Sequence, residues 1–447
     1  MKKIFNLSVV LLFVMAGCQK KDEYLLNRTP DERLTDALAQ YQNILTSAQY
    51  GWKVIVYPKG LEGVYGIKSA FSYFMQFKDA NTVTQLSDFD TTTASVPKTS
   101  GYRLKALQRP SIEFDTYGYI HLPCDPDPAI SKSPVASEGG GYGWGSDFDF
   151  AFADNKAPAQ LGDTIRLVGN FNSSPAIMVR ATKAEYDAFY AQGLKNAMVL
   201  DKILNYFKKI TVGSTVFEST PGGYRTITFK YLDGSNNLNT IVSPPYYLTP
   251  NSISFVSPFT VNGLVIKSID NLSFNAATNT ATCTINGVTS TIAGAIASIK
   301  TDLTAPQRWF AALPTNFNKA WRSDAGFHVN GVDDAYGVKT IPSFYQYWYW
   351  YNAISSTVDY FGPMVISGGS LANATYYSRV KSGPTFTVDG RAIFALSANT
   401  GTFPTSVTNT TNLFYNTTGF YFVQVDNVTY DMVSATDAKS WIRWWHN

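Results

Sequence analysis

The sequence has few of the side chains from which metal and catalytic sites are usually built. Its 447 residues include three Cys, three His and 15% charged residues. These leave little material for a zinc site with several His or Cys ligands. The 36 Lys and Arg residues nearly balance 33 Asp and Glu residues and are spread along the chain. A nucleic-acid-binding protein usually concentrates basic residues on one face. We therefore expect no metal, no cofactor and no nucleic-acid partner.

Recognisable catalytic motifs are also missing. The chain has no GxxxxGK(S/T) phosphate loop, no dinucleotide-binding glycine pattern and no Gly-x-Ser-x-Gly nucleophile turn. It contains seven Glu, and none follows Glu218. A two-carboxylate hydrolase in the second half would need two Asp, and Asp333, Asp334 and Asp359 are the candidates. Because each also fits an ordinary polar turn, we assign no catalytic residue and keep an Asp-dependent hydrolase as the alternative to a non-enzyme.

Long apolar runs are confined to the start of the chain. Lys2 and Lys3 precede the apolar run Ile4–Met15, which is too short to span a bilayer but fits a signal-peptide core. The following Val14–Cys18 resembles the lipobox of bacterial lipoproteins. The resemblance implies that residues 1–17 are a signal peptide and that Cys18 is lipidated. Acyl chains on Cys18 would make the membrane a partner of this protein.

Residues 18–29 read as a tether. Gln19–Glu23 contains lysines followed by two acids and resembles the surface-export signal of Bacteroidetes lipoproteins. The resemblance implies an anchor in the outer membrane that faces the outside of the cell. The alternative is a plain solvated tether, which any lipoprotein needs.

The rest of the chain has the pattern of a mainly β protein of the α+β class. A helix is expected over residues 30–50, capped by Thr29, and a second over Lys183–Lys209. Between them, short strand-like runs separated by turn residues predict an antiparallel meander curled into a barrel or sandwich. One of these runs is Tyr119–Leu122. The region after residue 209 is again β-rich, with a further helix or turn expected near Ala293–Leu303.

Two segments of the chain are alike in sequence. Met178–Ala184 and Met432–Ala438 share five of seven residues. Both patterns predict a closing strand, an N-cap Thr and an amphipathic helix. They indicate two tandem domains, at 30–208 and 209–447, each with an N-terminal helix and a meander, the second a diverged repeat of the first. Chance similarity at a common kind of junction is the alternative.

Two other patterns leave their chemistry open. Asp88 and Asp90, Asp125 and Asp127, and Asp147 and Asp149 each space two carboxylates by one residue. Such loops can supply oxygen ligands for Ca²⁺, but exposed strands and turns often carry this pattern. Cys124 and Cys283 can pair outside the cytoplasm, or Cys283 can be a core residue of a strand.

Aromatic residues, at 15% of the chain, give the clearest positive signal. Phe344–Tyr351 contains seven aromatics in eight residues. In a strand, its tyrosines would face one side, and Phe344, Trp348 and Trp350 the other. If one side is exposed, it forms an aromatic face of the kind that stacks on sugar rings. Trp144, in a Gly-rich loop, offers another ring. We therefore predict Trp144, Trp348 and Trp350 as ligand contacts, with core packing as the alternative.

The N-terminal half resembles a known but uncharacterised family. The residues that carry the resemblance are Asp31–Leu34, Leu45–Ala48, Gly51 and Trp52, Phe71–Phe77 and Phe114–Tyr117. They occur in the order seen in a domain-of-unknown-function family of Bacteroidetes lipoproteins, often encoded beside starch-utilisation-type outer-membrane importers. The resemblance covers residues 30–190, and Cys124 with the loop 125–138 departs from it. It supplies no catalytic residue.

This resemblance implies an accessory role in nutrient capture. We expect a surface-anchored, non-catalytic lipoprotein that binds a nutrient, most readily a glycan, or supports an importer complex. The alternatives are the Asp-dependent hydrolase and a purely structural partner of an outer-membrane transporter.

Overall fold

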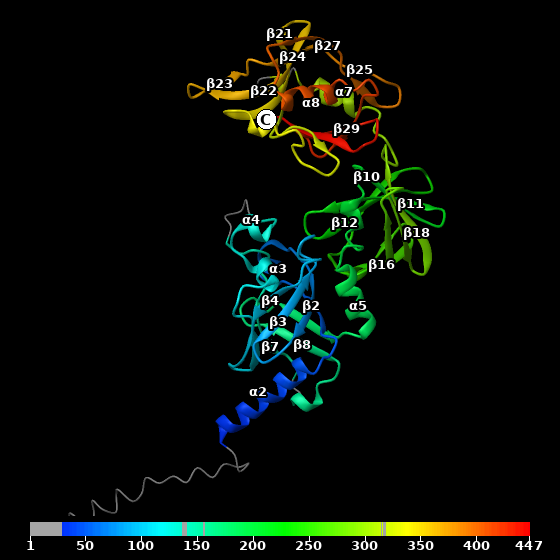
Figure 1. The fold of residues 1–447 in the computed structure, drawn as a ribbon. Helices are drawn as coiled ribbons and strands as arrows, with labels where there is room; N and C mark the ends of the chain where they lie inside the picture. The colour runs from blue at the N-terminus through cyan, green and yellow to red at the C-terminus, as the bar shows by residue number, and fades with distance from the viewer. Residues whose placement is uncertain (1–28, 136–140, 155–156, 314, 316–318) are drawn as a thin grey trace, which may run out of the picture.

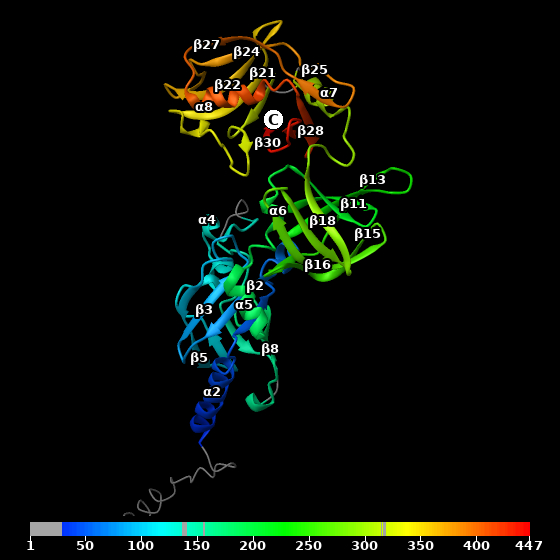
Figure 2. The ribbon, with the colours of Figure 1, turned by 45° about the vertical axis from the view of Figure 1, so that its right-hand side comes forward.

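The protein is built from three antiparallel sheets. The computed structural model describes residues 29–135, 141–154, 157–313, 315 and 319–447. Within these residues, the sheets have nine, nine and twelve strands (Figure 1). The prediction of a mainly β protein built from antiparallel meanders is confirmed. The sheets follow one another along the length of the molecule, with helix α2 (Pro30–Thr46) at one end and the third sheet at the other (Figures 1 and 2).

Helix α2 begins where its sequence signals predict. The Glu32 backbone N–H donates to Thr29 Oγ1 at 3.1 Å, and the Thr29 N–H donates to Glu32 Oε2 at 2.8 Å. This reciprocal pair satisfies two backbone donors at the helix start. Only the C-terminal part of α2 is buried, where Tyr41 and Leu45 pack into the first core. Trp52 then donates from its indole to Leu45 O at 3.0 Å, which fixes the helix against the first strand.

The first sheet is a meander whose ends meet. Its strands are β1 (Trp52–Val56), β2 (Phe71–Phe77), β3 (Thr82–Ser87), β4 (Lys98–Gly101), β5 (Arg103–Ala106), β6 (Pro110–Glu113), β7 (Asp149–Phe152), β8 (Thr164–Gly169) and β9 (Pro175–Arg180). Strand β1 pairs with both β2 and β9. Only Tyr102 separates β4, which pairs with β3, from β5, which pairs with β6. The meander therefore curls into a barrel-like unit.

The second sheet repeats this topology. Its strands are β10 (Phe207–Val212), β11 (Thr215–Gly222), β12 (Thr226–Leu232), β13 (Leu238–Val242), β14 (Tyr246–Thr249), β15 (Ser252–Val261), β16 (Leu264–Asn275), β17 (Thr280–Ile285) and β18 (Val288–Ala295). In the first sheet the order is β4-β3-β2-β1-β9-β8-β7-β6-β5, and in the second it is β13-β12-β11-β10-β18-β17-β16-β15-β14. Subtracting nine from each label of the second order gives the first. The structure therefore contains a repeated meander, located in the first two sheets.

The segment between these sheets differs from the expected long helix over Lys183–Lys209. It holds two short helices, α5 (Lys183–Gln192) and α6 (Val199–Lys202), before β10 begins at Phe207. Helix α5 stops because Gly193 adopts a left-handed φ of +57°, and a Cβ there would lie 1.9 Å from Ala94 O. The helix or turn expected near Ala293–Leu303 is also wrong in part, because β18 extends to Ala295 and the next helix, α7, spans Ala305–Ala311.

The third sheet follows a different plan. Its strands are β19 (Ala320–Ser323), β20 (His328–Val329), β21 (Phe344–Ser355), β22 (Val358–Ser367), β23 (Ser370–Asn373), β24 (Tyr377–Lys381), β25 (Thr385–Phe386), β26 (Arg391–Ile393), β27 (Leu396–Thr400), β28 (Phe420–Gln424), β29 (Thr429–Ser434) and β30 (Ser440–Trp445). Helices α7 and α8 (Thr405–Phe414) pack against this sheet through an aromatic core. Trp309 of α7, for example, stacks 5.5 Å from Trp321.

The two similar segments of the sequence have different structures. After β9, Thr182 caps α5 as predicted, and its Oγ1 accepts the Glu185 N–H at 3.3 Å. The strand-cap-helix prediction is wrong for the second segment. Ala438 takes a left-handed φ of 52°, and the chain turns back into β30 instead of a helix. The expected division at residue 208 falls inside β10 (Phe207–Val212), the first strand of the second sheet, and stays a prediction. The region 209–447 holds two of the three sheets, and its description as one domain stays a prediction.

A buried ion pair joins the first two sheets. Asp88, which follows β3, is fully buried and pairs with Arg225, which lies between β11 and β12. The same carboxylate accepts the Ser72 N–H at 3.0 Å and the Leu248 N–H at 2.8 Å. Ser72 belongs to β2 and Leu248 to β14. One carboxylate thus holds backbone from both sheets together.

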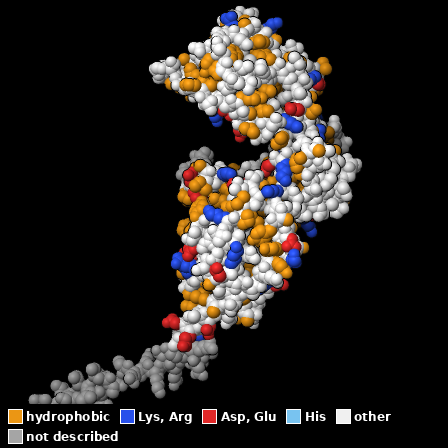
Figure 3. Space-filling view, viewed as in Figure 1, with side chains coloured by type: hydrophobic (Ala, Val, Ile, Leu, Met, Phe, Trp, Pro, Cys, Tyr) orange, Lys and Arg blue, Asp and Glu red, His pale blue; other side chains and the backbone are white. Residues whose placement is uncertain are grey.

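The third sheet meets the second through the segment that precedes β10. The Tyr206 hydroxyl donates to Asp431 Oδ2 at 2.8 Å, and the Tyr206 backbone N–H donates to Ala438 O at 2.7 Å. Figure 3 shows that one side of the molecule is hollowed between the first and third sheets. In the part of the chain that the structure describes, no helix has the length and apolar character needed to cross a membrane.

Candidate functional site

Two of the three predicted ligand-contacting tryptophans are buried, and the third is half-buried. Trp144 is 6% exposed, donates from Nε1 to Ser131 O at 2.9 Å and lies edge-on to Phe71. Trp348 is 2% exposed, and Trp350 is half-buried with its ring 5.5 Å from that of Trp348. Their role as ligand contacts stays a prediction, and the burial of Trp144 and Trp348 gives it no support.

The middle of the aromatic strand β21, Gln346–Tyr349, is buried on both sides. Tyr347 and Tyr349 are fully buried in the main core of the third sheet, as the alternation predicts. Trp348 faces away from them but is enclosed by a second cluster with Ala320, Tyr360 and Met364. Phe344 packs against the main core despite its opposite parity, because the register shifts between Phe344 and Gln346.

The remaining predicted positions fall into three groups. Cys18, with its predicted lipidation, lies outside the described residues. Cys124 and Cys283 are both free thiols, so they do not form a disulfide with each other. Among the described side chains, no group of three or more His, Cys, Asp or Glu is placed to hold a metal ion.

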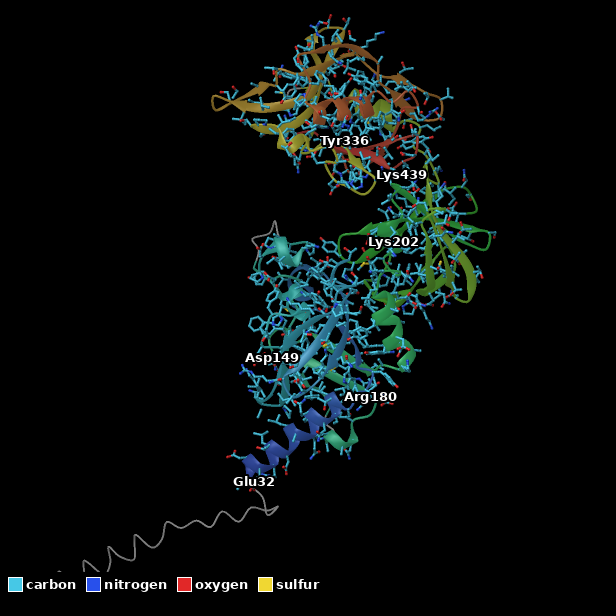
Figure 4. The ribbon with its side chains drawn as sticks, in the orientation of Figure 1. Glu32, Asp149, Arg180, Lys202, Tyr336 and Lys439 are labelled. Carbon is cyan, nitrogen blue, oxygen red and sulfur yellow. The ribbon has the colours of Figure 1, made fainter. Side chains whose placement is uncertain are left out.

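A candidate site lies at one end of the first sheet, where several strand connections meet. We call it the end pocket. It encloses about 590 Å³ and is lined by Gly60, Glu113, Cys124, Gly141, Tyr142, Gly145, Ser146, Asp147, Phe148, Asp149, Asn170, Phe171 and Asn172. These residues come from the connections β1–β2, β6–β7 and β8–β9 and from the ends of the adjoining strands. Figure 4 marks Asp149, the first residue of β7.

Asp147 fastens two of these connections together. It is 3% exposed, and its carboxylate accepts the backbone N–H groups of Phe171 (2.9 Å), Asn172 (2.7 Å) and Ser174 (3.1 Å). Asn172 Nδ2 donates back to Ser146 O at 2.7 Å. Because a carboxylate that accepts several N–H groups is well satisfied when buried, Asp147 sets the shape of the turn that carries Phe171.

Gly145 allows the β1–β2 connection to approach the β6–β7 connection closely. The Gly60 N–H donates to Gly145 O at 2.9 Å, and Gly145 has a left-handed φ of +65°. A Cβ on Gly145 would lie 2.7 Å from the Gly60 Cα. Any side chain at Gly145 would therefore push the β1–β2 connection away from the pocket.

The wall of the pocket carries carboxylate and amide groups. Asn170 Nδ2 donates to Asp149 Oδ1 at 2.7 Å, and Asp149 lies opposite Glu113 in the β6–β7 pair. Burial raises the pKa of Asp149; Asn170 opposes this shift, and the charge of Glu113 adds to it. Burial also acts to raise the pKa of Glu113, but hydrogen bonds from Arg103 and Lys105 bring it below its usual value. The pKa values of these two neighbouring carboxyl groups are therefore shifted in opposite directions.

The rim of the pocket carries aromatic rings. Phe171 is 91% exposed, Tyr142 is 67% exposed and Phe148 is 42% exposed. The Phe148 ring stacks on His121 with centroids 4.8 Å apart. His121 is fixed in turn, since its Nδ1 accepts the Gly118 N–H at 3.0 Å and its Nε2 lies 3.0 Å from Phe114 O. Burial lowers the pKa of His121. This stack therefore has a neutral imidazole behind Phe148.

Sequence reasoning missed this rim. The sequence predicts Trp side chains as ligand contacts, whereas the exposed rings are those of Phe171, Tyr142 and Phe148. Two signals were present. Phe171 interrupts a polar turn, Asn170–Ser174. The spaced carboxylates Asp147 and Asp149 stand at the start of β7, which pairs with the strand that leads into this turn. The expected strand over Tyr119–Leu122, near the pocket, is also wrong: Tyr119–Cys124 is a 3₁₀ helix that includes Pro123, which has no N–H to give to a ladder.

Comparison with solved structures gives only weak similarities. The chain is similar to transferrin-binding protein B, isotype 1, of serogroup B Neisseria meningitidis, with 9% identity, 89% of this chain and 74% of that chain covered, and a TM-score of 0.15. For a mutant of transferrin-binding protein B from Haemophilus parasuis Hp5, the identity is also 9%, the coverage is 88% and 74%, and the TM-score is 0.13. Because these TM-scores are so low, neither similarity supports an argument about this chain.

Comparison with protein families gives a definite result. No curated protein matches the chain. The family model described as Domain of unknown function (DUF4302) matches residues 22–275. The matched range includes all of the first sheet and the second as far as the end of β16, and it leaves the third sheet outside. Since the match covers more than half of the 447 residues, the chain belongs to the DUF4302 family.

Proposed function

We propose that this protein is a non-catalytic, surface-anchored lipoprotein that captures a nutrient, namely a glycan, in the end pocket. The observation that carries the proposal is the combination of exposed rings on the rim with carboxylate and amide groups on the wall. Aromatic rings stack on the C–H faces of sugars, while Asp and Asn side chains bond to their hydroxyl groups. The volume of about 590 Å³ lies within the range of small-molecule pockets.

The position of the pocket supports capture away from a membrane. Helices α3 (Glu62–Tyr65) and α4 (Pro128–Ser131) belong to the connections β1–β2 and β6–β7 and lie at the end of the first sheet opposite α2 (Figure 1). The proposed anchor at Cys18 precedes α2 in the chain. A lipid on Cys18 would therefore tether the molecule to the outer membrane at its α2 end and leave the end pocket at the opposite end of the first sheet. Delivery of the ligand to an outer-membrane importer is part of the same proposal.

The test is a binding comparison between single-residue variants of the mature chain. Binding of neutral oligosaccharides of glucose, mannose, xylose and N-acetylglucosamine would be measured by calorimetry. Phe171→Ala should weaken the strongest interaction about tenfold, as expected from the loss of one stacked ring, without lowering the melting temperature. Val388→Ala is the matched control, because Val388 is an apolar side chain 99% exposed on the third-sheet region. Equal binding by both variants and the wild type would refute the pocket assignment.

A hydrolase is the second candidate, and one observation favours it. Asp149 and Glu113 face each other on paired strands with pKa values moved apart, which is the arrangement of an acid and its partner carboxylate. Glu113 is already engaged by Arg103 and Lys105, however, which leaves it poorly placed to act as a nucleophile. Release of reducing ends from a bound oligosaccharide, abolished in Asp149→Asn, would establish the hydrolase. A transporter pull-down without any ligand affinity would instead select the structural-partner alternative.

A further inference from the structure

The third sheet contains a buried arginine between two tryptophan rings. Arg322 of β19 lies directly opposite Trp445 of β30 on one side and Trp348 of β21 on the other. Its guanidinium carbon is 5.0 Å from the centre of the Trp348 ring and 5.4 Å from the centre of the Trp445 ring. The whole residue is 7% exposed. This row runs across three adjacent strands on the side of the sheet that faces away from the main core.

Arg322 lacks an acidic partner, unlike other arginines of the same region. Arg308 pairs with Asp302, Arg391 with Asp389, and Arg443 with Asp431. Among the described residues, no hydrogen bond or ion pair is made by the Arg322 side chain, and its Nε is both sealed from solvent and unpartnered. Its two Nη atoms are likewise without an acceptor, and they are not among the polar atoms sealed from solvent.

The surroundings of Arg322 offer donors and rings instead of acceptors. Trp445 Nε1 is another buried donor without a partner. The Asp324 carboxylate, which follows β19, already accepts from Gln346 Nε2 at 3.2 Å. Burial lowers the pKa of Arg322, although the guanidinium still carries its charge at neutral pH. Cation–π contacts offset only part of the free energy lost when an unpaired charge is buried. A bound anion would therefore supply the charge partner that Arg322 lacks.

We propose that Arg322 and Trp445 form a second binding site, which takes the carboxylate of an acidic sugar such as a uronic acid. The planar guanidinium presents two Nη groups in the spacing of a carboxylate. The half-buried Trp445, together with Tyr345, 47% exposed on the adjacent strand β21, supplies ring surface for the sugar itself. A free acidic peptide would use the guanidinium but gain little from these rings. The site is separate from the end pocket and stands whether or not that pocket binds a glycan.

The experiment titrates the full mature chain with four probes while tryptophan fluorescence and heat are recorded. The probes are trigalacturonate, maltotriose, hexaglutamate and inorganic sulfate. We expect trigalacturonate to quench fluorescence and to bind at least about tenfold more tightly than the other three, because it alone combines a carboxylate with sugar rings. In R322M this preference should disappear, while R322K should keep a weaker form of it.

A matched control and a folding check keep the result interpretable. Arg379 of β24 is an exposed arginine of the same sheet, and R379Q should leave trigalacturonate binding unchanged. If R322M fails to fold, R322K decides, because it retains the positive charge but loses the paired Nη groups. Equal binding of trigalacturonate by the wild type and the folded Arg322 variant overturns the proposal. So does a preference for hexaglutamate or sulfate, or an absence of binding by all four probes.

Discussion

The first and second sheets share one topology but differ in the connections at one end. In the first sheet, the connections β1–β2, β6–β7 and β8–β9 span residues 57–70, 114–148 and 170–174. In the second sheet, the corresponding connections β10–β11, β15–β16 and β17–β18 are the pairs 213–214, 262–263 and 286–287. The three long connections of the first sheet are those that line the end pocket.

This difference shows which part of the repeated meander carries the candidate function. Two-residue hairpin turns satisfy their own strands and leave no room between them for a ligand. The two sheets therefore share one arrangement of strands. In the second sheet these strands are joined by tight turns at this end, whereas in the first sheet the longer connections form a pocket. Function commonly resides in connections held by a rigid scaffold. If the comparison is correct, changes in the first-sheet connections should affect binding, whereas changes in the second-sheet turns should affect only stability.

The largest expected effect lies where the two sheets meet. Arg225→Met would leave Asp88 buried without its partner and should lower the free energy of unfolding by about 3–5 kcal/mol. Urea unfolding followed by far-UV circular dichroism measures this loss. The double variant Asp88→Asn with Arg225→Met should recover much of it, because no uncompensated charge remains. A loss below about 1 kcal/mol in the single variant would indicate that the two sheets are not coupled through this pair.

The second effect tests the fastening of the pocket itself. Asp147→Ala leaves the N–H groups of Phe171, Asn172 and Ser174 without their acceptor. The substitution should lower the free energy of unfolding by about 3 kcal/mol. It should also abolish ligand binding. Thermal unfolding and calorimetric titration measure the two consequences.

Asp233 provides the matched control at the same end of the second sheet. It accepts the Ser235 and Asn237 N–H groups, both at 2.9 Å, but is open to water. Asp233→Ala should therefore cause a smaller loss of stability and no change in binding. Equal losses in both variants would mean that the pocket has no special dependence on Asp147.

The sequence predicts the local structure of these sheets better than their arrangement. Thr29 caps α2 as expected, and Tyr347 and Tyr349 share one face of β21 as expected, because capping and alternation depend on neighbours in the chain. The similarity of residues 178–184 to 432–438 predicts a repeat, but the repeated topology lies in the first two sheets, and the second of these segments belongs to the third. Similar segments can enter a helix or a hairpin, and the choice at Ala438 follows from pairing with a distant strand.

The candidate site was harder to predict for a similar reason. Ring chemistry favours Trp144 and Trp348 as ligand contacts, but their exposure depends on which other elements cover them. Phe171 reaches solvent because Asp147, 24 residues earlier, holds its turn outward. That contact joins the connections beside the paired strands β7 and β8 and leaves no periodic pattern in the sequence. Residue type therefore indicated a role in binding, whereas long-range packing decided which residue is available for it.

The third effect is on the pH dependence of glycan binding. Burial, opposed by Asn170 and reinforced by Glu113, raises the pKa of Asp149, so this carboxyl takes up a proton at a higher pH than an ordinary Asp. Protonation removes an acceptor for a sugar hydroxyl, and affinity should fall on the order of tenfold as the pH drops through that raised pKa.

Calorimetric titrations at several pH values, with Asp149→Asn as the control, check this prediction. Asp149→Asn should show weaker binding that no longer changes over this pH range. Glu113 is not expected to contribute, because its lowered pKa keeps it ionised there. An unchanged pH dependence in Asp149→Asn would assign the titration to another group.

The smallest effect concerns how the turns are stabilised, by the backbone conformation of their own residues in the second sheet and by the buried carboxylate of Asp147 in the first. Asn262 and Gly263 join β15 to β16 with φ values of 48° and 78°, and Asn accepts this left-handed conformation more readily than Ala. Asn262→Ala should therefore lower the free energy of unfolding by about 0.5–1 kcal/mol. Ser173, at φ 59° in the first-sheet turn, is the matched position. Ser173→Ala should cost less, since Asp147 holds that turn through its neighbours and Ser has little advantage over Ala at positive φ. Urea unfolding of both variants measures the two changes in the free energy of unfolding. A larger loss of stability in Ser173→Ala than in Asn262→Ala would show that local conformation, and not the buried carboxylate, shapes the turn that carries Phe171.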